Sequence, residues 1–319
     1  MDEFIGSIQF NQNGDLLLSS SYLTFQSWTG FIGVLPKSDI SNNSKILLSK
    51  LRIKKKFHSA PSVARWTTNE SILIGNDSGD VELLNLSESS EDNFEVVMSK
   101  CQHDGIVTCL DTKFDSNLAL SGSDDATIKV WDLNESMSKH TYRAHDFSIT
   151  SLTFKPNETD CFISTSQDYK SLLWDTRKDK PALNFKHNLT GFPSCSAMST
   201  NDLNMIVLGS EFGELGVYDV RNLSQNMIRK VHDRLIRQIK INQKNLIATV
   251  SEDCTTKVSQ VVKPSVLNEM DLKTIYSCKH GDYVTGIDWD LRNDSEFVTC
   301  SWDGFVKTHL IDLKMQNGH

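Results

Sequence analysis

The sequence lacks long apolar runs and paired cysteines, and each lack excludes a class of protein. No apolar segment approaches the ~18 residues that a membrane-spanning helix needs, so no membrane partner is expected. The start, Met1-Asp2-Glu3-Phe4, has no basic segment followed by an apolar core, which argues against a secretory signal. The seven cysteines form no Cys-x-x-Cys pair. They therefore indicate reduced thiols and a protein of the cytoplasm or nucleus.

Positive charge is also in short supply. The chain has 33 lysines and arginines against 41 aspartates and glutamates, which gives a formal net charge of -8. A general nucleic-acid binder needs a basic face to displace counterions from phosphates, so direct binding to nucleic acid is not expected. The acidic balance instead fits a protein partner with a basic surface or basic tails.

What the sequence does contain is an internal repeat. The segment from Ser121 to Asp132 reads SGSDDATIKVWD, and related segments recur along the chain at 74–85, 164–175, 208–219, 249–260 and 299–310. The aspartate position of this segment recurs at intervals of 41 to 50 residues, as Ser78, Asp125, Asp168, Phe212, Asp253 and Asp303. A histidine precedes most of these positions by 21 to 23 residues, namely His103, His145, His232 and His280. Phased His and Asp residues with a terminal Trp-Asp pair are typical of WD repeats, each of which forms one four-stranded blade.

The repeat predicts an all-β fold, a seven-bladed WD-repeat β-propeller that occupies 1–319 as a single domain. A seventh copy lies at the start, where Ile5 to Phe10 and Leu16 to Ser21 flank an Asn-Gly turn. We expect blades at about 1–57, 58–102, 103–144, 145–186, 187–231, 232–279 and 280–319. The last blade has no obvious fourth strand. Either it is three-stranded, or a partner covers its edge, or Met1 is not the natural start of the protein.

Ser121, His103 and Asp125 together resemble a nucleophilic triad. The same grouping recurs in other copies, and because an enzyme needs one active site, repetition favours a structural hydrogen-bond network. We expect this network to contain His103, Ser121, Asp125, Trp131, His145, Ser164, Asp168, Trp174, His232 and Asp253, with a reduced version at His280 and Asp303, since His309 replaces the usual Trp. No metal-ligand spacing or phosphate-binding glycine loop is present. The sequence thus predicts no catalytic residues, no cofactor and no enzyme.

Two short motifs leave alternatives open. The basic run of Lys50, Arg52, Lys54, Lys55 and Lys56 fits either a nuclear-import or acidic-partner patch or, as we favour, a solvated outer strand. The segment from Trp174 to Arg177 matches the Trp-Asp-x-Arg pattern of propellers that act as ubiquitin-ligase substrate receptors. An arginine just past a strand is common in such repeats, so the structural interpretation is favoured there too.

Trp28 stands outside the repeated Trp position of its blade, in the segment TFQSWTGF. From the residues alone it could be tucked into the core, or it could be an exposed anchor of the residue type most enriched at interface hot spots. Neither alternative is favoured by the pattern.

Several irregular details together resemble the methylosome protein 50 family over nearly the whole chain. They are DSGDVEL at 77–83, the stretch from Ser121 to His145, LLWDTR at 172–177 with the KPA that follows, and Ser301-Trp302-Asp303 with His309 after it. The resemblance implies a seven-bladed propeller that is a non-catalytic scaffold in a hetero-oligomer with a type II protein arginine methyltransferase. It also implies that the chain presents Arg-rich substrates, histone tails and Sm proteins, for symmetric dimethylation of arginine.

The resemblance further implies where the methyltransferase binds. In that family a Trp on a loop of the first blade inserts into the amino-terminal domain of the enzyme, and the matching position is Trp28. The implied partner-binding residues are therefore Trp28 and its neighbours Phe25, Ser27, Thr29 and Phe31. Vertebrate members carry a proline-rich amino-terminal extension that this sequence does not show. The second function that we consider is a substrate receptor of a cullin-RING ubiquitin ligase, which would use the strip from Trp174 to Arg177.

Overall fold

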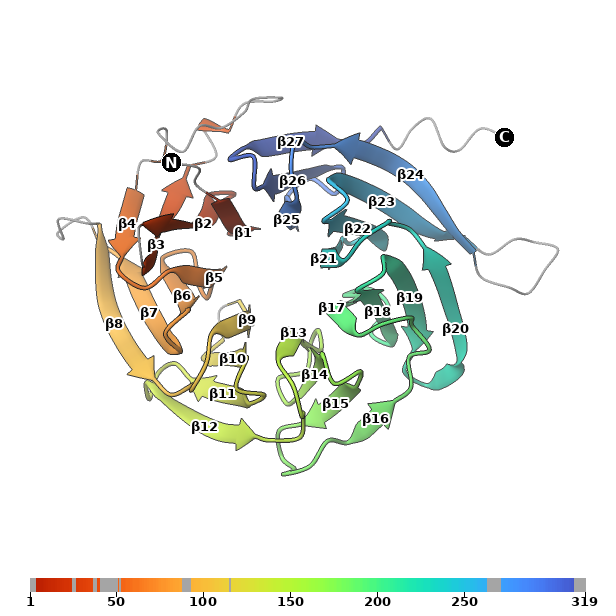
Figure 1. Cartoon of the computed structure of the whole chain (residues 1–319), viewed down its shortest axis with the longest axis horizontal. Helices are drawn as coiled ribbons and strands as arrows, with labels where there is room; N and C mark the ends of the chain where they lie inside the picture. Colours follow the sequence, from red (N-terminus) through yellow and green to blue (C-terminus); the bar gives the residue numbers. More distant parts are fainter. Residues whose placement is uncertain are drawn as a thin grey trace.

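The strands of the chain form seven antiparallel sheets arranged like blades around a central axis (Figure 1). This computed structural model describes residues 4–24, 27–36, 39–40, 51, 53–87, 93–114, 116–262 and 271–312. We number the sheets blade 1 to blade 7 in chain order. The predicted all-β, seven-bladed propeller is confirmed.

Each blade is a meander in which consecutive strands pair. Blades 1 to 3 consist of β1 (Phe4–Phe10), β2 (Leu16–Thr24), β3 (Ser27–Leu35), β4 (Ile53–Phe57); β5 (Pro61–Trp66), β6 (Ser71–Asn76), β7 (Asp80–Leu86), β8 (Phe94–Cys101); and β9 (Val107–Thr112), β10 (Leu118–Ser123), β11 (Ile128–Asp132), β12 (Met137–Tyr142). Blades 4 and 5 consist of β13 (Ile149–Phe154), β14 (Cys161–Ser166), β15 (Ser171–Asp175), β16 (Leu183–Phe185); and β17 (Pro193–Met198), β18 (Met205–Ser210), β19 (Glu214–Asp219), β20 (Asn222–Lys230). Blades 6 and 7 consist of β21 (Ile236–Ile241), β22 (Leu246–Ser251), β23 (Thr255–Val262), β24 (Asp271–Lys279); and β25 (Val284–Trp289), β26 (Glu296–Ser301), β27 (Val306–Leu310).

Burial changes from the axis to the rim in a way that the sequence reflects. The second strands β18 and β22 are buried at every residue because neighbouring blades cover both of their faces, and they read as continuous runs of apolar and small residues. The outermost strand β12 instead has only Tyr142 buried. Small residues allow the blades to approach closely. A Cβ added at Gly122 in β10 would lie 2.6 Å from Cγ2 of Ile149 in the next blade.

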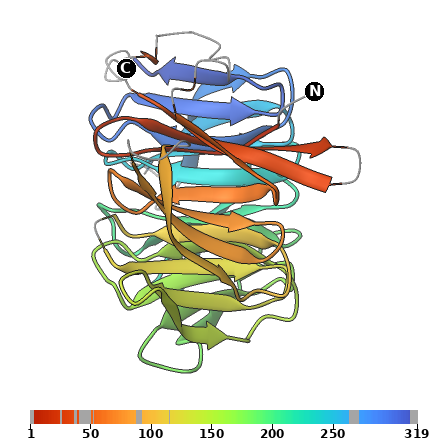
Figure 2. The ribbon, with the colours of Figure 1, turned by 90° about the vertical axis from the view of Figure 1, so that its left-hand side faces the viewer.

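The polypeptide meanders in the same sense in every blade, which sorts the loops onto two faces. We call the face that carries the turns between second and third strands, and the loops that enter the innermost strands, the upper face. The other turns lie on the lower face. The β2–β3 hairpin turns on the upper face, and Figure 2 shows this hairpin, in red, extending beyond the other strands on one side of the disc.

The ring closes where the three described strands of blade 7 meet blade 1. Ile5, Ile8 and Phe10 of β1 share one buried apolar cluster with Val298 and Cys300 of β26. The Thr285 hydroxyl donates a hydrogen bond to the Ile5 carbonyl at 2.6 Å, and the Phe10 N–H donates to Oδ2 of Asp288 at 2.8 Å. The described residues therefore contain no strand exchanged between these two blades; side chains pack across the junction instead. Among the described residues, no helix is long and apolar enough to cross a lipid bilayer.

Candidate functional site

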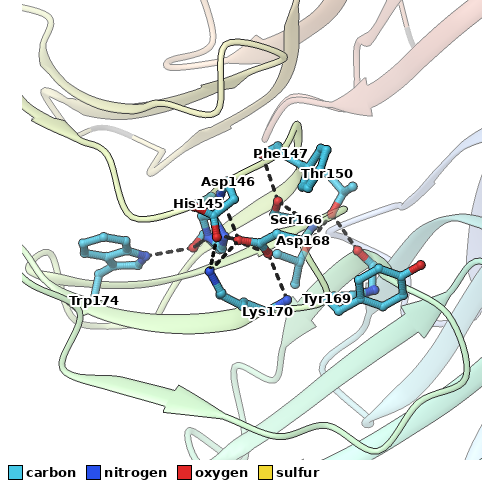
Figure 3. Close-up of polar contacts among 12 residues, drawn as sticks. His145, Asp146, Phe147, Thr150, Ser166, Asp168, Tyr169, Lys170 and Trp174 are labelled. Carbon is cyan, nitrogen blue, oxygen red and sulfur yellow. Dashed lines mark hydrogen bonds and ion pairs between the residues drawn. The ribbon is translucent and has the colours of Figure 1, made fainter.

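The predicted hydrogen-bond network is present in blade 4, which Figure 3 shows in close-up. His145 lies on the loop that enters the blade, and its Nδ1 is 3.0 Å from Oδ2 of Asp168 in the turn between β14 and β15. A carboxylate only accepts, so Nδ1 carries the proton and Nε2 accepts from the Ser164 hydroxyl at 2.8 Å. The Trp174 indole N–H in turn donates to Ser164 Oγ at 2.8 Å. Loop, turn and two strands are thus joined by one chain of hydrogen bonds.

Electrostatics keep this network in a single protonation state at neutral pH. Burial lowers the pKa of His145 below its ordinary 6.5, and it does so against the opposing effect of Asp168. The pKa of Asp168 is itself below its ordinary value; burial would raise it, but the His145 ring and the N–H groups of Asp146 and Lys170 outweigh burial. A neutral imidazole therefore donates to an ionised carboxylate.

Other blades repeat the arrangement. In blade 3, His103 Nδ1 lies 3.0 Å from Asp125 Oδ2 and its Nε2 lies 2.7 Å from Ser121 Oγ, to which Trp131 also donates. In blade 6, His232 makes the corresponding contacts with Asp253 at 2.9 Å and with the Thr249 hydroxyl at 2.8 Å. The hydroxyls of Ser121, Ser164 and Thr249 belong to fully buried residues, so no substrate can reach them. This geometry cannot perform nucleophilic catalysis; it fastens each loop to its blade.

Blade 7 departs from this scheme. His280 Nε2 and His309 Nε2 both lie near the Thr299 hydroxyl, at 3.2 and 2.7 Å, and Tyr276 OH contacts His309 Nδ1 at 2.9 Å. The reduced network predicted at His280 and Asp303 needs correction. Within the described residues His280 Nδ1 has no hydrogen-bond partner, because Asp303 accepts from the Gly281 N–H instead. Burial lowers the pKa of His280 to about 4 and that of His309 to about 3.

A further loop histidine, which the sequence repeat does not reveal, lies ahead of blade 5. His187 lies buried on the loop that enters blade 5, donates from Nε2 to the Tyr169 carbonyl at 3.0 Å, and accepts at Nδ1 from the Leu189 N–H. Tyr218, which stands where other blades have Trp, donates its hydroxyl to the His187 carbonyl. The sequence feature that could have identified His187 is its position ahead of β17, where other blades have their loop histidine. The His–Asp spacing does not reveal it, because Phe212 replaces the partner aspartate.

Trp28 lies near the start of β3, paired with Leu23 across the hairpin, and it is 48% exposed. Four other tryptophans are buried, namely Trp66, Trp131, Trp174 and Trp289. The remaining one, Trp302, is partly covered and packs against the rings of Phe4 and Tyr283. Trp28 is thus a large apolar side chain presented to solvent on the projecting hairpin.

The other predicted contact residues around Trp28 are placed differently. Thr29 follows it in β3 and is partly exposed. Phe25 and the side chain of Ser27 lie outside the described residues. The prediction for Phe31 is corrected, because its ring is 1% exposed and the Lys54 ammonium lies 3.6 Å from its centroid. Phe31 packs inside blade 1 and presents no surface to a partner.

The two motifs with open alternatives both have structural partners. Lys54, Lys55 and Lys56 lie on the outermost strand β4, while Lys50 and Arg52 lie outside the described residues. Arg177 forms a two-pronged ion pair with Asp175 two residues before it, with both distances 2.8 Å. The same local pair recurs as Arg221 with Asp219 and as Arg292 with Asp290. Repetition of this pair favours a structural role for Arg177.

A cavity of about 640 Å³ follows the central axis and is lined mainly by the innermost strands. Its lining carries Arg65, Asp111 and Lys240 at one end and Asp124 and Trp302 toward the upper face. Among the described residues, no group of three or more His, Cys, Asp or Glu side chains is arranged to hold a metal ion.

Comparison with known proteins agrees with this geometry. The family model "WD domain, G-beta repeat" matches residues 95–132, 136–175 and 272–308. Each match begins in or just before the outermost strand of one blade and ends in the third strand of the next, so the sequence repeat is offset from the blade by one strand.

Similarity to one relative extends over nearly the whole chain. The methylosome protein WDR77 of Xenopus laevis is 28% identical over 313 residues, which cover 97% of this chain and 90% of that protein. The E3 ubiquitin-protein ligase COP1 of Arabidopsis thaliana is 27% identical over 49% of this chain, and the protein transport protein Sec31A of Rattus norvegicus is 25% identical over 75%. These matches cover only 23% and 20% of the two larger proteins.

Proposed function

Because this chain belongs to the methylosome protein 50 family, we propose that it is a non-catalytic scaffold that holds a type II protein arginine methyltransferase in a hetero-oligomer. It presents arginine-rich substrates such as histone tails and Sm proteins for symmetric dimethylation, in the cytoplasm and the nucleus. Support comes from the full-length similarity to a methylosome subunit and from the buried hydroxyls, which leave the repeated networks without catalytic access.

The exposed indole of Trp28 is the observation that carries the proposal. Paired strands hold the backbone of the projecting hairpin. The Trp28 side chain is therefore presented in a defined position, and a partner that binds it loses little conformational entropy in ordering the backbone. Large aromatic side chains of this kind dominate interface energies when a partner pocket removes them from water. The ligase-receptor alternative is not favoured, because Arg177 is held by Asp175 in the same way as two other arginines of the chain.

Replacing Trp28 with alanine is expected to weaken binding to the methyltransferase by about 2 kcal/mol, or about thirtyfold, as for other buried aromatic hot spots. The measurement is a titration of each purified variant against the methyltransferase by calorimetry. The free energy of unfolding should stay unchanged, because Trp28 is already half exposed.

Met137→Ala provides the matched control, since Met137 on β12 is exposed to the same extent but lies on the outer rim. It should bind the enzyme like the unmodified chain. Equal binding by Trp28→Ala and the unmodified chain would contradict the proposed interface, and no binding by either would contradict the proposed function.

A further inference from the structure

We propose that the upper face carries a second docking site, for arginine-containing segments of the substrate protein, formed by exposed aromatic rings of blades 4 and 5 and adjacent carboxylates. We call this surface the aromatic patch and define it by Phe147, Tyr169, Phe212, Asp124 and Glu211. That the bound segment belongs to a methylation substrate rests on the proposed function. That the patch binds arginine side chains is argued from the structure alone.

The three rings are unusually exposed for their size. Phe147 is 61% exposed, Tyr169 is 63% exposed and Phe212 is 49% exposed. Phe147 lies on the loop that enters β13, whereas Tyr169 and Phe212 lie in the turns that follow β14 and β18. All three therefore belong to the upper face, and Figure 3 shows Phe147 and Tyr169 directed away from the buried network beneath them.

Hydrogen bonds between neighbouring loops hold them side by side. The Asp124 carboxylate accepts a hydrogen bond from the Ser148 hydroxyl, next to Phe147. The Gln167 N–H donates to the Ser148 carbonyl at 3.1 Å, which ties the Tyr169 turn to the Phe147 loop. The Tyr169 carbonyl accepts from His187, and the Glu211 N–H donates to the Phe192 carbonyl at 3.1 Å on the same loop. The rings thus sit on loops that are fixed by the networks described above.

On the upper-face loops of blades 3 to 5, acidic side chains outnumber basic ones. Asp104 and Asp124 are exposed, Glu211 is partly exposed, and among the described residues none of these three forms an ion pair. Asp146 is neutralised by Lys170 at 2.5 Å, and Glu214 accepts from the N–H and hydroxyl of Thr190.

The exposed cations of the same loops are Arg143 and Lys186, which directly follow the outermost strands β12 and β16. They therefore lie at the rim. At the start of blade 6, the exposed cations Arg234 and Arg237 are already engaged, because Arg237 pairs with Glu252 at 2.5 Å and Arg234 donates to the Tyr283 hydroxyl at 2.9 Å. A ligand on blades 4 and 5 therefore meets free carboxylates and aromatic faces.

This combination selects arginine. A guanidinium is planar, stacks on aromatic faces and pairs with carboxylates through several N–H groups, whereas a lysine ammonium is compact and more strongly hydrated. The patch also lies on the same face as the β2–β3 hairpin but on blades 4 and 5, across the axis from blade 1 (Figure 1). A methyltransferase anchored at Trp28 and a substrate segment at the aromatic patch would therefore share one face without sharing residues.

The test uses a fluorescently labelled peptide of alternating glycine and arginine and the purified full chain without any enzyme, with binding followed by fluorescence anisotropy. We expect saturable binding, weakened about threefold to tenfold by Phe147→Ala and by Phe212→Ala, as loss of one stacked cation would produce. Asp124→Asn and Glu211→Gln should weaken binding and flatten its dependence on salt. The corresponding glycine–lysine peptide should bind more weakly.

Leu291→Ala is the matched control, because Leu291 is equally exposed but follows β25 on the lower face. Its affinity for the peptide should equal that of the unmodified chain. Equal affinity of the two phenylalanine variants and Leu291→Ala, or equal affinity for arginine and lysine peptides, would overturn the aromatic patch.

A second arm separates this proposal from the proposed function. The Phe147→Ala and Phe212→Ala variants are titrated against the methyltransferase, and both should bind it as the unmodified chain does. If they lose the enzyme while keeping the peptide, the patch is an enzyme interface and the inference is wrong. If the unmodified chain binds the peptide but no methyltransferase, the proposed function fails and the arginine site stands.

Discussion

Asp168→Ala is expected to lower the free energy of unfolding by about 3 kcal/mol or more, because it removes a buried carboxylate that accepts several hydrogen bonds, and each bond to a charged group contributes about 1.5–3 kcal/mol. The Asp168 carboxylate is only 3% exposed. It accepts from the His145 ring and from the N–H groups of Asp146 and Lys170 at 3.0–3.1 Å. Alanine would leave the buried His145 N–H and the two backbone N–H groups without this acceptor. The measurement is urea denaturation at pH 7.5 followed by tryptophan fluorescence.

Asp146→Ala is the matched control, because Asp146 pairs with the same Lys170 but its side chain is 72% exposed. Removal of such an exposed pair costs about 0–1 kcal/mol. Asp303→Ala should fall between the two, since Asp303 caps its turn without contact to His280. Equal losses for Asp168→Ala and Asp146→Ala would show that the network does not stabilise the blade.

Acid should destabilise the chain well above the pH at which its carboxylates protonate. The pKa values of His280 and His309 are about 4 and about 3 in the folded chain, against an ordinary value of 6.5. Between these values the unfolded chain binds more protons than the folded one. The free energy of unfolding therefore falls as the pH drops from about 6.5 toward about 4, by about 1.4 kcal/mol per pH unit for each such histidine. Urea denaturation at a series of pH values measures this slope.

His309→Gln tests whether the buried histidines of blade 7 cause this acid sensitivity, because an amide can still reach the Thr299 hydroxyl but does not titrate. Its stability should depend less steeply on pH between 6.5 and 4 than that of the unmodified chain. Leu291→Ala, which changes an exposed side chain that carries no titratable group, should leave the slope as it was. An unchanged slope in His309→Gln would place the acid sensitivity elsewhere in the fold.

The fold was predictable from sequence because each blade repeats the same network. His145 and Asp168 stand 23 residues apart in the chain yet meet in space, and the same phase in other copies identifies the blade without any structural knowledge. Where one partner is replaced the signal disappears. His187 has no phased aspartate in the sequence because Phe212 stands at that position, although the histidine is still buried in the corresponding loop.

The candidate sites were only partly predictable, because exposure depends on neighbours that a single segment does not contain. Trp28 and Phe31 are three residues apart on the same strand, yet one is presented to solvent and the other is covered by Lys54 from the adjoining strand. The aromatic patch gave no sequence signal at all. Its aromatic side chains lie in three separate loops, and only the circular arrangement of the blades brings those loops together.

The junction between blade 7 and blade 1 has a thermodynamic consequence. At each of the other six junctions the chain itself crosses from one blade to the next, so neighbouring blades cannot drift apart. In the described residues the junction between blade 7 and blade 1 is held by apolar packing and a few hydrogen bonds alone. Because no chain segment crosses this junction there, its local opening requires less free energy than opening at the other six. A partner that binds across this junction would bind the closed state alone, and its binding free energy would add to the stability of the whole ring.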